Sequence, residues 1–295
     1  MARRLAGLVV NPGRFGDPDR LRQAFTAASA GGDWAEPLVL TTTAQDPGAA
    51  AASEAATAGA SVVFAVGGDG TVRACAGALA GTQVPLAIVP MGSANLTARA
   101  LGIPSRLGAA LEVGLRGADR RIDLATADGA TFAAMAGIGL DAAVVGATAD
   151  VAKRLAGWPA YAAAAVSQLL QPPATFTVRL DESEPLIRRA RSVAVGNCGL
   201  LPGGFRILPD AELDDGMLDV AILAPGLLGW ASVGYRVIAA SRRDDSGLER
   251  YRARRVEVRV GAVLPRQADG EMIGPGSSLT VAVQPGALLV RVPPG

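Results

Sequence analysis

The sequence predicts two domains, an α/β domain with a doubly wound parallel sheet and then a β-rich, sandwich-like domain. The chain has 295 residues, enough for two ordinary cores. Half of its residues are hydrophobic but only 4% are aromatic, which is typical of small apolar side chains packed between helices and a sheet. Strand-like and helix-like segments alternate up to about Asp123, and strand-like segments dominate after it. We therefore place the first domain at residues 1–124 and the second at 125–295, with the option that the last strand returns to the first domain.

Strands and helices are expected to alternate along the first domain. A helix should begin at Asp46-Pro47, because Asp is a good N-cap and Pro suits the first helical position. This alternation predicts a parallel sheet with helices on both faces. The expected strands are residues 5–10, 38–41, 62–66 and 85–89, and the expected helices are residues 17–30, 46–58, a segment after residue 71, and 95–101.

Several segments of the second domain alternate apolar and polar residues. Alternation of this kind indicates antiparallel strands with one face on the core. The expected strands are residues 175–180, 191–195, 218–223, 255–260 and 279–283.

The amino-acid composition limits the kinds of catalytic group, metal site and partner that the protein can have. The chain contains no histidine, so catalytic triads and metal sites that use an imidazole are excluded, and any general base is expected to be a carboxylate. Cys75 and Cys198 have no CxxC neighbour, which predicts neither a disulfide framework nor a thiolate metal site and fits a cytoplasmic protein. The net charge of +1 creates no field that collects nucleic acid, so we expect no nucleic-acid partner.

Three segments bear on membrane contact. Residues 223–240 approach membrane-span length but contain Pro225, Arg236 and several glycines, so a buried or interfacial helix is expected rather than a span. Residues 153–170 predict either an amphipathic helix at a lipid cleft or bilayer, or a core helix. An arginine group within residues 242–255 either touches anionic headgroups or forms a solvated face. We expect peripheral membrane contact, and a homodimer stays open.

The strongest chemical signal is a strand that ends in a glycine-rich turn. The strand at residues 62–66 runs into Gly67-Gly68-Asp69-Gly70-Thr71. The glycines let the backbone approach an anion closely, and the helix that follows adds its positive end. Asp69 would supply a carboxylate for a Mg²⁺ ion shared with phosphate oxygens. The simpler interpretation is an Asp-Gly turn between a strand and a helix.

A second turn repeats this logic at the end of the next strand. Pro90-Met91-Gly92-Ser93-Ala94-Asn95 places a glycine before Ser and Asn, which can serve as helix caps or as nucleotide contacts. Taken alone, the segment is more often a helix N-cap. Two such turns at the carboxyl ends of neighbouring parallel strands predict a ligand site, because open α/β sheets bind ligands at that edge.

Together these residues resemble the diacylglycerol kinase catalytic family, the bacterial lipid kinases related to diacylglycerol, sphingosine and ceramide kinases. The resemblance covers nearly the whole chain. Besides the two turns it includes, in order, Asn11-Pro12, Leu101-Gly102-Ile103-Pro104, Ile122-Asp123-Leu124, Ala136-Gly137-Ile138-Gly139-Leu140-Asp141, Gly196-Asn197, Leu208-Pro209-Asp210-Ala211, Asp214-Asp215-Gly216-Met217-Leu218-Asp219-Val220 and Asp269-Gly270-Glu271.

The resemblance implies an ATP-dependent lipid kinase that phosphorylates diacylglycerol or a related lipid. Its first domain would be a Rossmann-like nucleotide-binding domain, with the active site in the cleft between the two domains. A Mg²⁺ ion would be held by a network that includes Asp69 and Asp123. The implied ATP contacts are Asn11, Thr41, Gly67, Gly68, Asp69, Gly70, Thr71, Ser93 and Asn95.

The resemblance also gives roles to two acidic segments of the second domain. Asp269 looks like the general base that takes the proton of the lipid hydroxyl, and Glu271 like a metal or phosphate-side carboxylate. Read alone, Asp269-Gly270-Glu271 is a solvated hairpin turn. The loop at Asp215 resembles a structural Mg²⁺ or Ca²⁺ site completed by backbone carbonyls of Glu212 and Met217, and an Asp-Gly β-turn is an equal alternative.

One position departs from the family pattern. Many members have Asp directly after the Asn of the second turn, whereas this chain has Leu96. We therefore expect the metal network to rely on Asp69, Asp123 and Glu271.

Two other functions stay open. An NAD kinase shares the first glycine turn and the two-domain layout, but Gly92-Ser93-Ala94-Asn95 does not match the Asn-x-Gly-x-Leu-Gly pattern of NAD kinases. A lipid- or nucleotide-binding protein with weak or no catalysis is conceivable because of Leu96.

Overall fold

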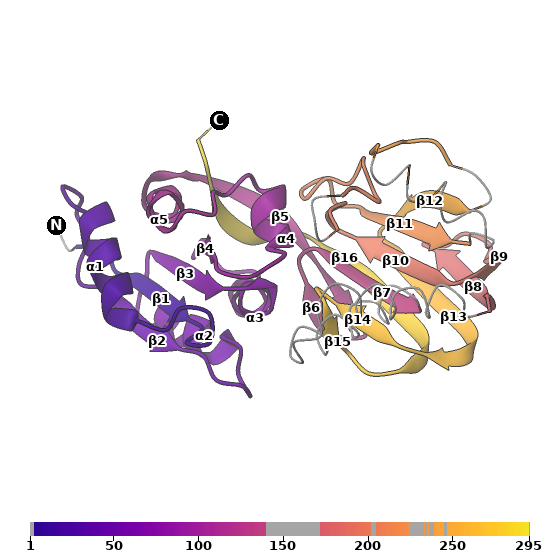
Figure 1. Ribbon diagram of the computed structural model, residues 1–295, viewed down its shortest axis with the longest axis horizontal. Helices are drawn as coiled ribbons and strands as arrows, with labels where there is room; N and C mark the ends of the chain where they lie inside the picture. The colour runs from indigo at the N-terminus through magenta and orange to yellow at the C-terminus, as the bar shows by residue number, and fades with distance from the viewer. Residues whose placement is uncertain are drawn as a thin grey trace. The chain divides into compact units, whose positions relative to one another are not determined.

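The computed structural model describes residues 3–139, 172–201, 205–224, 239–244 and 247–294, together with Val233 and Tyr235. The expected helix at 153–170, the end of the 136–141 motif and most of the apolar run at 223–240 lie outside the described residues. The chain divides into two compact units (Figure 1): unit 1 is Met1–Leu124 with Pro285–Gly295, and unit 2 is Ala125–Gln284. Two strands, β5 (Ala118–Ala127) and β16 (Gly276–Val292), contribute residues to both units.

Unit 1 contains a parallel sheet in the order β2-β1-β3-β4. The end of β16 extends this order, because Val290 pairs in parallel with Leu86. The parallel strands are short, and β1 and β3 are buried along their whole length, as expected for strands covered on both faces. Their bounds are β1 (Ala6–Val10), β2 (Leu38–Thr41), β3 (Val62–Gly67) and β4 (Leu86–Pro90).

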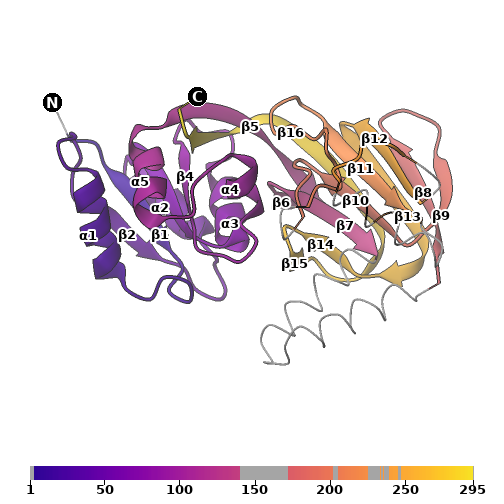
Figure 2. The same ribbon diagram turned by 45° about the horizontal axis from the view of Figure 1, so that its top comes forward.

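Helices cover both faces of this sheet (Figure 2). The Phe64 ring of β3 meets Phe25 of α1 edge-on, with ring centroids 5.9 Å apart, and a side chain at Gly114 of α5 would collide with it. The opposite face carries α2, since a Cβ at Gly7 would lie 2.4 Å from Ala55. The sheet is therefore doubly wound. The helices are α1 (Pro18–Ala28), α2 (Ala49–Thr57), α3 (Asp69–Leu79), α4 (Leu96–Ala100) and α5 (Leu107–Arg116).

The helix starts follow the capping chemistry with one correction. Asp17 caps α1 by accepting the N–H groups of Asp19 and Arg20. The expected helix at 46–58 begins three residues later, at Ala49, because Gly48 at a φ of 137° is not helical. Asp46 nevertheless accepts the N–H groups of residues 48, 49 and 50, so it caps the helix from outside. Helix α5 was missed by the sequence prediction.

Unit 2 is built from antiparallel strands. One sheet has the order β12-β11-β10-β7-β14-β15. The other strands of unit 2 pack against this sheet. Among them, β13 lies between β16 and β8, β8 pairs with β9, and β5 pairs with β6. The bounds are β6 (Ala130–Phe132), β7 (Met135–Gly139), β8 (Ala174–Leu180), β9 (Leu186–Ala190), β10 (Ser192–Gly196), β11 (Leu218–Leu223), β12 (Leu248–Ala253), β13 (Arg255–Leu264), β14 (Arg266–Ala268) and β15 (Glu271–Met272).

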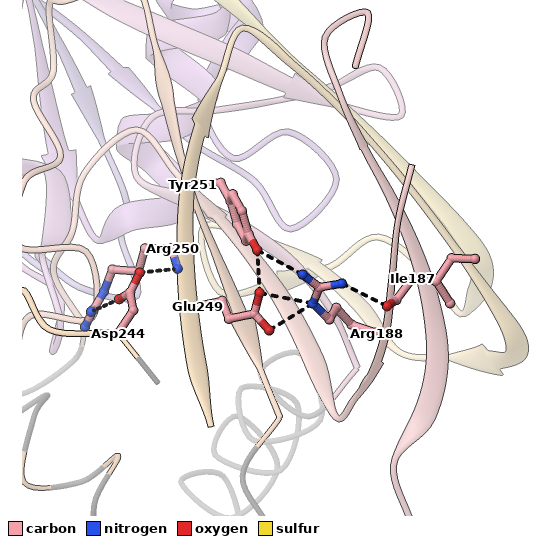
Figure 3. Close-up of polar contacts among 6 residues, drawn as sticks. All are labelled: Ile187, Arg188, Asp244, Glu249, Arg250 and Tyr251. Atoms are coloured by element: carbon pink, nitrogen blue, oxygen red, sulfur yellow. Dashed lines mark hydrogen bonds and ion pairs between the residues drawn. The ribbon is translucent and has the colours of Figure 1, made fainter. Parts of the chain in front are cut away.

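Side chains from both sets of strands share one core in unit 2. Phe132, Phe176, Val193, Val220 and Val256 are fully buried in it, as in a β-sandwich. At its edge, Arg188 of β9 donates to the Glu249 carboxylate and to the Tyr251 hydroxyl, both on β12 (Figure 3). These bonds tie an outer strand of one sheet to an outer strand of the other.

Each strand that the sequence predicts in the second half coincides with an observed strand. The segment at 279–283 is only part of the 17-residue strand β16, which continues past Pro285 into unit 1. The sequence prediction missed β5, β6, β7, β9, β12, β14 and β15. Of these, β15 has two residues and β6 and β14 three each, too short for alternation to be recognised.

Among the described residues, no helix has the length and apolar character needed to cross a membrane.

Candidate functional site

The topology of unit 1 marks a binding edge. Strand β1 lies between β2 and β3, so the chain connections run in opposite directions from it. In sheets of this order, ligands bind outside the carboxyl ends of the strands at such a reversal. Asn11 directly follows β1, and its N–H donates to Val66 near the end of β3 at 3.0 Å. Its side-chain Nδ2 lies 3.4 Å from the Thr71 hydroxyl oxygen, so Asn11 also links the end of β1 to the first turn of α3.

The first glycine turn leaves the start of α3 open to an anion. Helix α3 begins at Asp69, and its N-cap residue Gly68 provides no capping side chain. The N–H groups of a first helical turn have no partners within the helix, and they carry the positive end of its dipole. Gly67 packs so tightly that a Cβ there would lie 2.5 Å from the Thr71 hydroxyl oxygen. The residues present therefore fit a phosphate group.

The second turn packs directly against the first. The Met91 N–H donates to the Gly67 carbonyl at 2.8 Å. The Asn95 side chain accepts the Gly92 N–H at 2.9 Å and donates to the Gly92 carbonyl at 2.7 Å, while Asn95 itself has a φ of 49°. A Cβ at Gly92 would lie 2.8 Å from the Gly68 Cα. Glycine is therefore needed where the two backbones meet.

Asp69 links the two turns. Its Oδ2 accepts the Asn95 N–H at 2.9 Å, and its Oδ1 accepts the Leu96 N–H at 2.7 Å. Burial raises the pKa of Asp69, although the N–H groups of Leu96 and Asn95 act in the opposite direction. The carboxylate expected to serve a Mg²⁺ ion is thus already bonded to the second turn.

The other predicted residues of unit 1 have different surroundings. Thr41 ends β2 and is exposed, and Ser93 is exposed in the second turn, so topology puts both at the carboxyl edge of the sheet. Asp123 is buried on β5, and its Oδ1 accepts the Gly286 N–H at 2.7 Å. That bond fastens the returning part of β16 to unit 1. Of the predicted residues, the structure brings Asn11, Asp69, Thr71 and Asn95 together around the two glycine turns.

The predicted base, Asp269, lies in unit 2 and is buried. With Gly270 it forms the two-residue loop between β14 and β15, and both residues have positive φ. Its Oδ2 accepts the N–H of Ala133, and its Oδ1 accepts those of Ala134 and Met135, all at 2.8–2.9 Å. The hairpin interpretation is therefore right, but the expectation of a solvated turn is wrong for Asp269, which is only 8% exposed. Glu271 is exposed on β15.

Sequence reasoning gave Asn197 no role, yet it belongs to this network. It is 1% exposed, donates from Nδ2 to the Ala133 carbonyl at 3.1 Å, and donates from its backbone N–H to the Ala134 carbonyl at 2.8 Å. Asn197 and Asp269 thus hold the same short segment. The signal that could have found it was its place in the Gly196-Asn197 pair.

The loop at Asp215 contains a turn and an ion pair. Asp215 accepts the Met217 N–H at 2.9 Å and pairs with Arg252, which also lies 3.6 Å from Asp219. Burial raises the pKa of Asp219 to about 6, against the effect of Arg252 and with the help of nearby carboxylates including Glu212. Across the described ranges, no three metal-ligating side chains are arranged to hold a cation.

The arginine group has carboxylate partners within the chain. Arg242 pairs with Asp210 at 2.5 Å, Arg250 with Asp244 at 2.7 Å (Figure 3), and Arg255 with Glu257 at 3.0 Å. Such pairs contribute little to stability, and both interpretations of the arginine group stay predictions.

Fold and site together define a class: an α/β domain with an uncapped helix start at the carboxyl edge of its sheet, joined along the chain to an antiparallel β-sandwich. Residues 25–127 match the family described as the diacylglycerol kinase catalytic domain. Residues 134–292 match the YegS C-terminal NAD kinase beta sandwich-like domain. A relative from Pseudomonas fluorescens, named "Probable lipid kinase YegS-like", is 32% identical over 99% of this chain and 97% of its own. The chain belongs to the YegS-like branch of the diacylglycerol kinase catalytic-domain family, so the predicted resemblance is confirmed.

Solved structures share the fold. Two crystal structures of Bacillus anthracis proteins have TM-scores of 0.77 and 0.73 at 22% and 20% identity, and they cover 99% and 98% of this chain and 98% and 97% of their own. The second is that of a diacylglycerol kinase. Yeast NADH kinase in complex with NADH is more distant, with a TM-score of 0.51 at 10% identity over 98% of this chain and 84% of its own. The predicted fold class is confirmed.

Proposed function

We propose that this protein is an ATP-dependent lipid kinase that transfers the γ-phosphoryl group to the hydroxyl of diacylglycerol or a related lipid. The observation that carries the proposal is the pair of glycine turns bonded to each other at the carboxyl ends of β3 and β4, with an uncapped helix start in the first of them. The name of the Pseudomonas relative supports a lipid as acceptor.

ATP is proposed to place its phosphates at the first turn of α3. Backbone N–H groups of residues 68–71 would bind them, and Asn11, Thr41, Ser93 and Asn95 would contact the rest of the nucleotide. A bound Mg²⁺ ion would offset the charge of the phosphates, held by them and by the carboxylates Asp69, Asp123 and Glu271.

Asp269 is proposed to act on the acceptor. The lipid hydroxyl oxygen bonds to the γ-phosphorus, the bond from that phosphorus to the bridging oxygen of ADP breaks, and the hydroxyl proton passes to the Asp269 carboxylate. The three N–H groups bonded to Asp269 orient it and stabilise its negative charge.

Further properties stay predictions. The loop of Glu212, Asp215 and Met217 is proposed to bind a structural Mg²⁺ or Ca²⁺ ion, which would raise the thermal midpoint of the protein above its value in EDTA. We also propose a cytoplasmic location, which cell fractionation tests, and peripheral contact with membranes, which vesicle sedimentation tests. A homodimer would be detected by light scattering.

The test of the function is a transfer assay. Purified protein with labelled ATP, Mg²⁺ and a lipid panel is expected to yield one phosphorylated lipid, and Asp269→Asn to reduce its formation at least about 100-fold. Circular dichroism must show that the variant is folded. Undiminished transfer by a folded Asp269→Asn protein would remove the assigned role.

The same assay addresses the competing functions. The shared fold of yeast NADH kinase keeps a dinucleotide acceptor worth testing, so NAD is included in the panel. Formation of NADP would replace the proposal. ATP binding without transfer to any acceptor would favour a binding protein.

A further inference from the structure

Asp69 makes an unusual connection for a residue in the first turn of a helix. It begins α3, but its carboxylate bonds to the N–H groups at the start of α4, 26 and 27 residues later. The side chain of Asn95, the N-cap of α4, is turned back to Gly92 instead. Asp69, which belongs to the first glycine turn, therefore caps α4, the helix that follows the second glycine turn.

The bonds of Asp69 act where the two backbones already touch. Gly68 and Gly92 lie so close that a Cβ at Gly92 would be 2.8 Å from the Gly68 Cα, and the Met91 N–H bonds to the Gly67 carbonyl. Asn95 has a positive φ, a conformation that is uncommon for non-glycine residues, although asparagine adopts it more readily than most. Hydrogen bonds to an ionised acceptor are about twice as strong as neutral ones. The Asp69 carboxylate thus supplies the charged link that holds this conformation.

We infer that Asp69 is a positioning residue, which holds the second turn in place against the phosphate-binding turn, and that this is its main contribution to nucleotide binding. The inference rests on the proposed function. It also gives the two glycine turns different roles. The first N–H groups of α4 donate to Asp69, whereas the start of α3 has no capping side chain and receives the phosphates.

The inference revises the expectation about Leu96. The absence of Asp at this position was expected to leave Asp69 with more of the metal to hold. Leu96 instead contributes its backbone N–H to Asp69 at 2.7 Å. A carboxylate side chain there would add a second negative charge beside that of Asp69, so an apolar side chain is compatible with the link.

The experiment separates positioning from metal binding by leaving the metal out. Hydrogen exchange of the Asn95 and Leu96 amides and calorimetric binding of ADP in EDTA are measured for the wild type, Asp69→Asn and Asp69→Glu. The control is Asp181→Asn, because Asp181 of unit 2 likewise accepts two consecutive N–H groups, those of Arg254 and Arg255. The glutamate variant keeps the charge but moves it by one methylene, and it serves if the asparagine variant does not fold.

Both Asp69 variants are expected to exchange the two amides, and to release metal-free ADP, at least about tenfold more readily than the wild type. The control should leave ADP binding unchanged. A residue that served only the metal would give the opposite sign, since Asp69→Asn removes a negative charge beside the phosphates and would leave metal-free binding equal or tighter. Unchanged amide exchange or undiminished ADP binding overturns the inference. Failure of the wild type to bind ADP would contradict the proposed function. The amide exchange would still test whether Asp69 holds the second turn in place.

Discussion

Asp69 of unit 1 and Asp269 of unit 2 have the same structural role, which is to accept backbone N–H groups from another segment of the chain. Each carboxylate accepts backbone N–H groups from a segment far away in the sequence, and each is followed by a glycine. Asp69 is half-buried in a helical turn and accepts two such groups. Asp269 is buried in a tight hairpin at a φ of 48° and accepts three, from residues more than 130 positions earlier.

The difference concerns how much of the structure depends on each carboxylate. A buried N–H group that loses its acceptor cannot turn to water, whereas a half-buried one partly can. The structure of unit 2 should therefore depend on Asp269 more than that of unit 1 depends on Asp69. For Asp269 this means that a loss of activity must be separated from a loss of folding, which the following predictions make measurable.

The largest effect is expected for Asp269→Ala. It leaves the N–H groups of Ala133, Ala134 and Met135 without this acceptor, and the free energy of unfolding should fall by at least about 3 kcal/mol. Urea denaturation measures it. The exposed neighbour is the control: Glu271→Ala should change stability by less than about 1 kcal/mol. Equal losses in the two variants would show that the three bonds contribute little.

A medium effect is expected where the two turns of unit 1 meet. Gly92→Ala places a Cβ 2.8 Å from the Gly68 Cα and 2.7 Å from the Asn95 Oδ1, so we expect a loss of about 1–3 kcal/mol together with weaker nucleotide binding. Gly108→Ala is the matched control, because nothing lies within 4 Å of a Cβ there and the residue is helical. It should stabilise the protein by about 0.5–1 kcal/mol. Denaturation curves that rank the two variants in the reverse order would refute the close contact.

The smallest effect is expected for Glu249, a carboxylate bonded by side chains at the edge of unit 2. Burial raises its pKa, but the Arg188 guanidinium and the Tyr251 hydroxyl outweigh burial and hold it below its usual value. A lowered pKa stabilises the fold above the unfolded-state pKa, and this contribution disappears as pH falls through the folded-state pKa. Glu249→Gln should therefore cost at most about 1 kcal/mol at neutral pH and nothing at acidic pH, measured by urea unfolding at both. A pH-independent difference would point to lost packing instead.

Much of unit 1 was predictable because its signals are local. The four parallel strands and the turn at residues 67–71 are runs of apolar or glycine residues within a short window. The start of α2 was misplaced because its cap, Asp46, lies outside the helix and Gly48 intervenes. In unit 2 the short strands β14 and β15 escaped prediction, although they form the hairpin that presents Asp269.

By itself, the sequence determined the two-part architecture, the glycine turn at residues 67–71 and the family to which the chain belongs, since alternation, glycine spacing and motif order are local features of the chain. Only the tertiary structure decided which N–H groups each carboxylate accepts. Asp69 meets Asn95 and Leu96 because parallel packing brings the ends of β3 and β4 together, and Asp269 meets residues 133–135 because β14 pairs with β7. Such bonds join residues through strand pairing rather than through sequence proximity, so no local pattern encodes them.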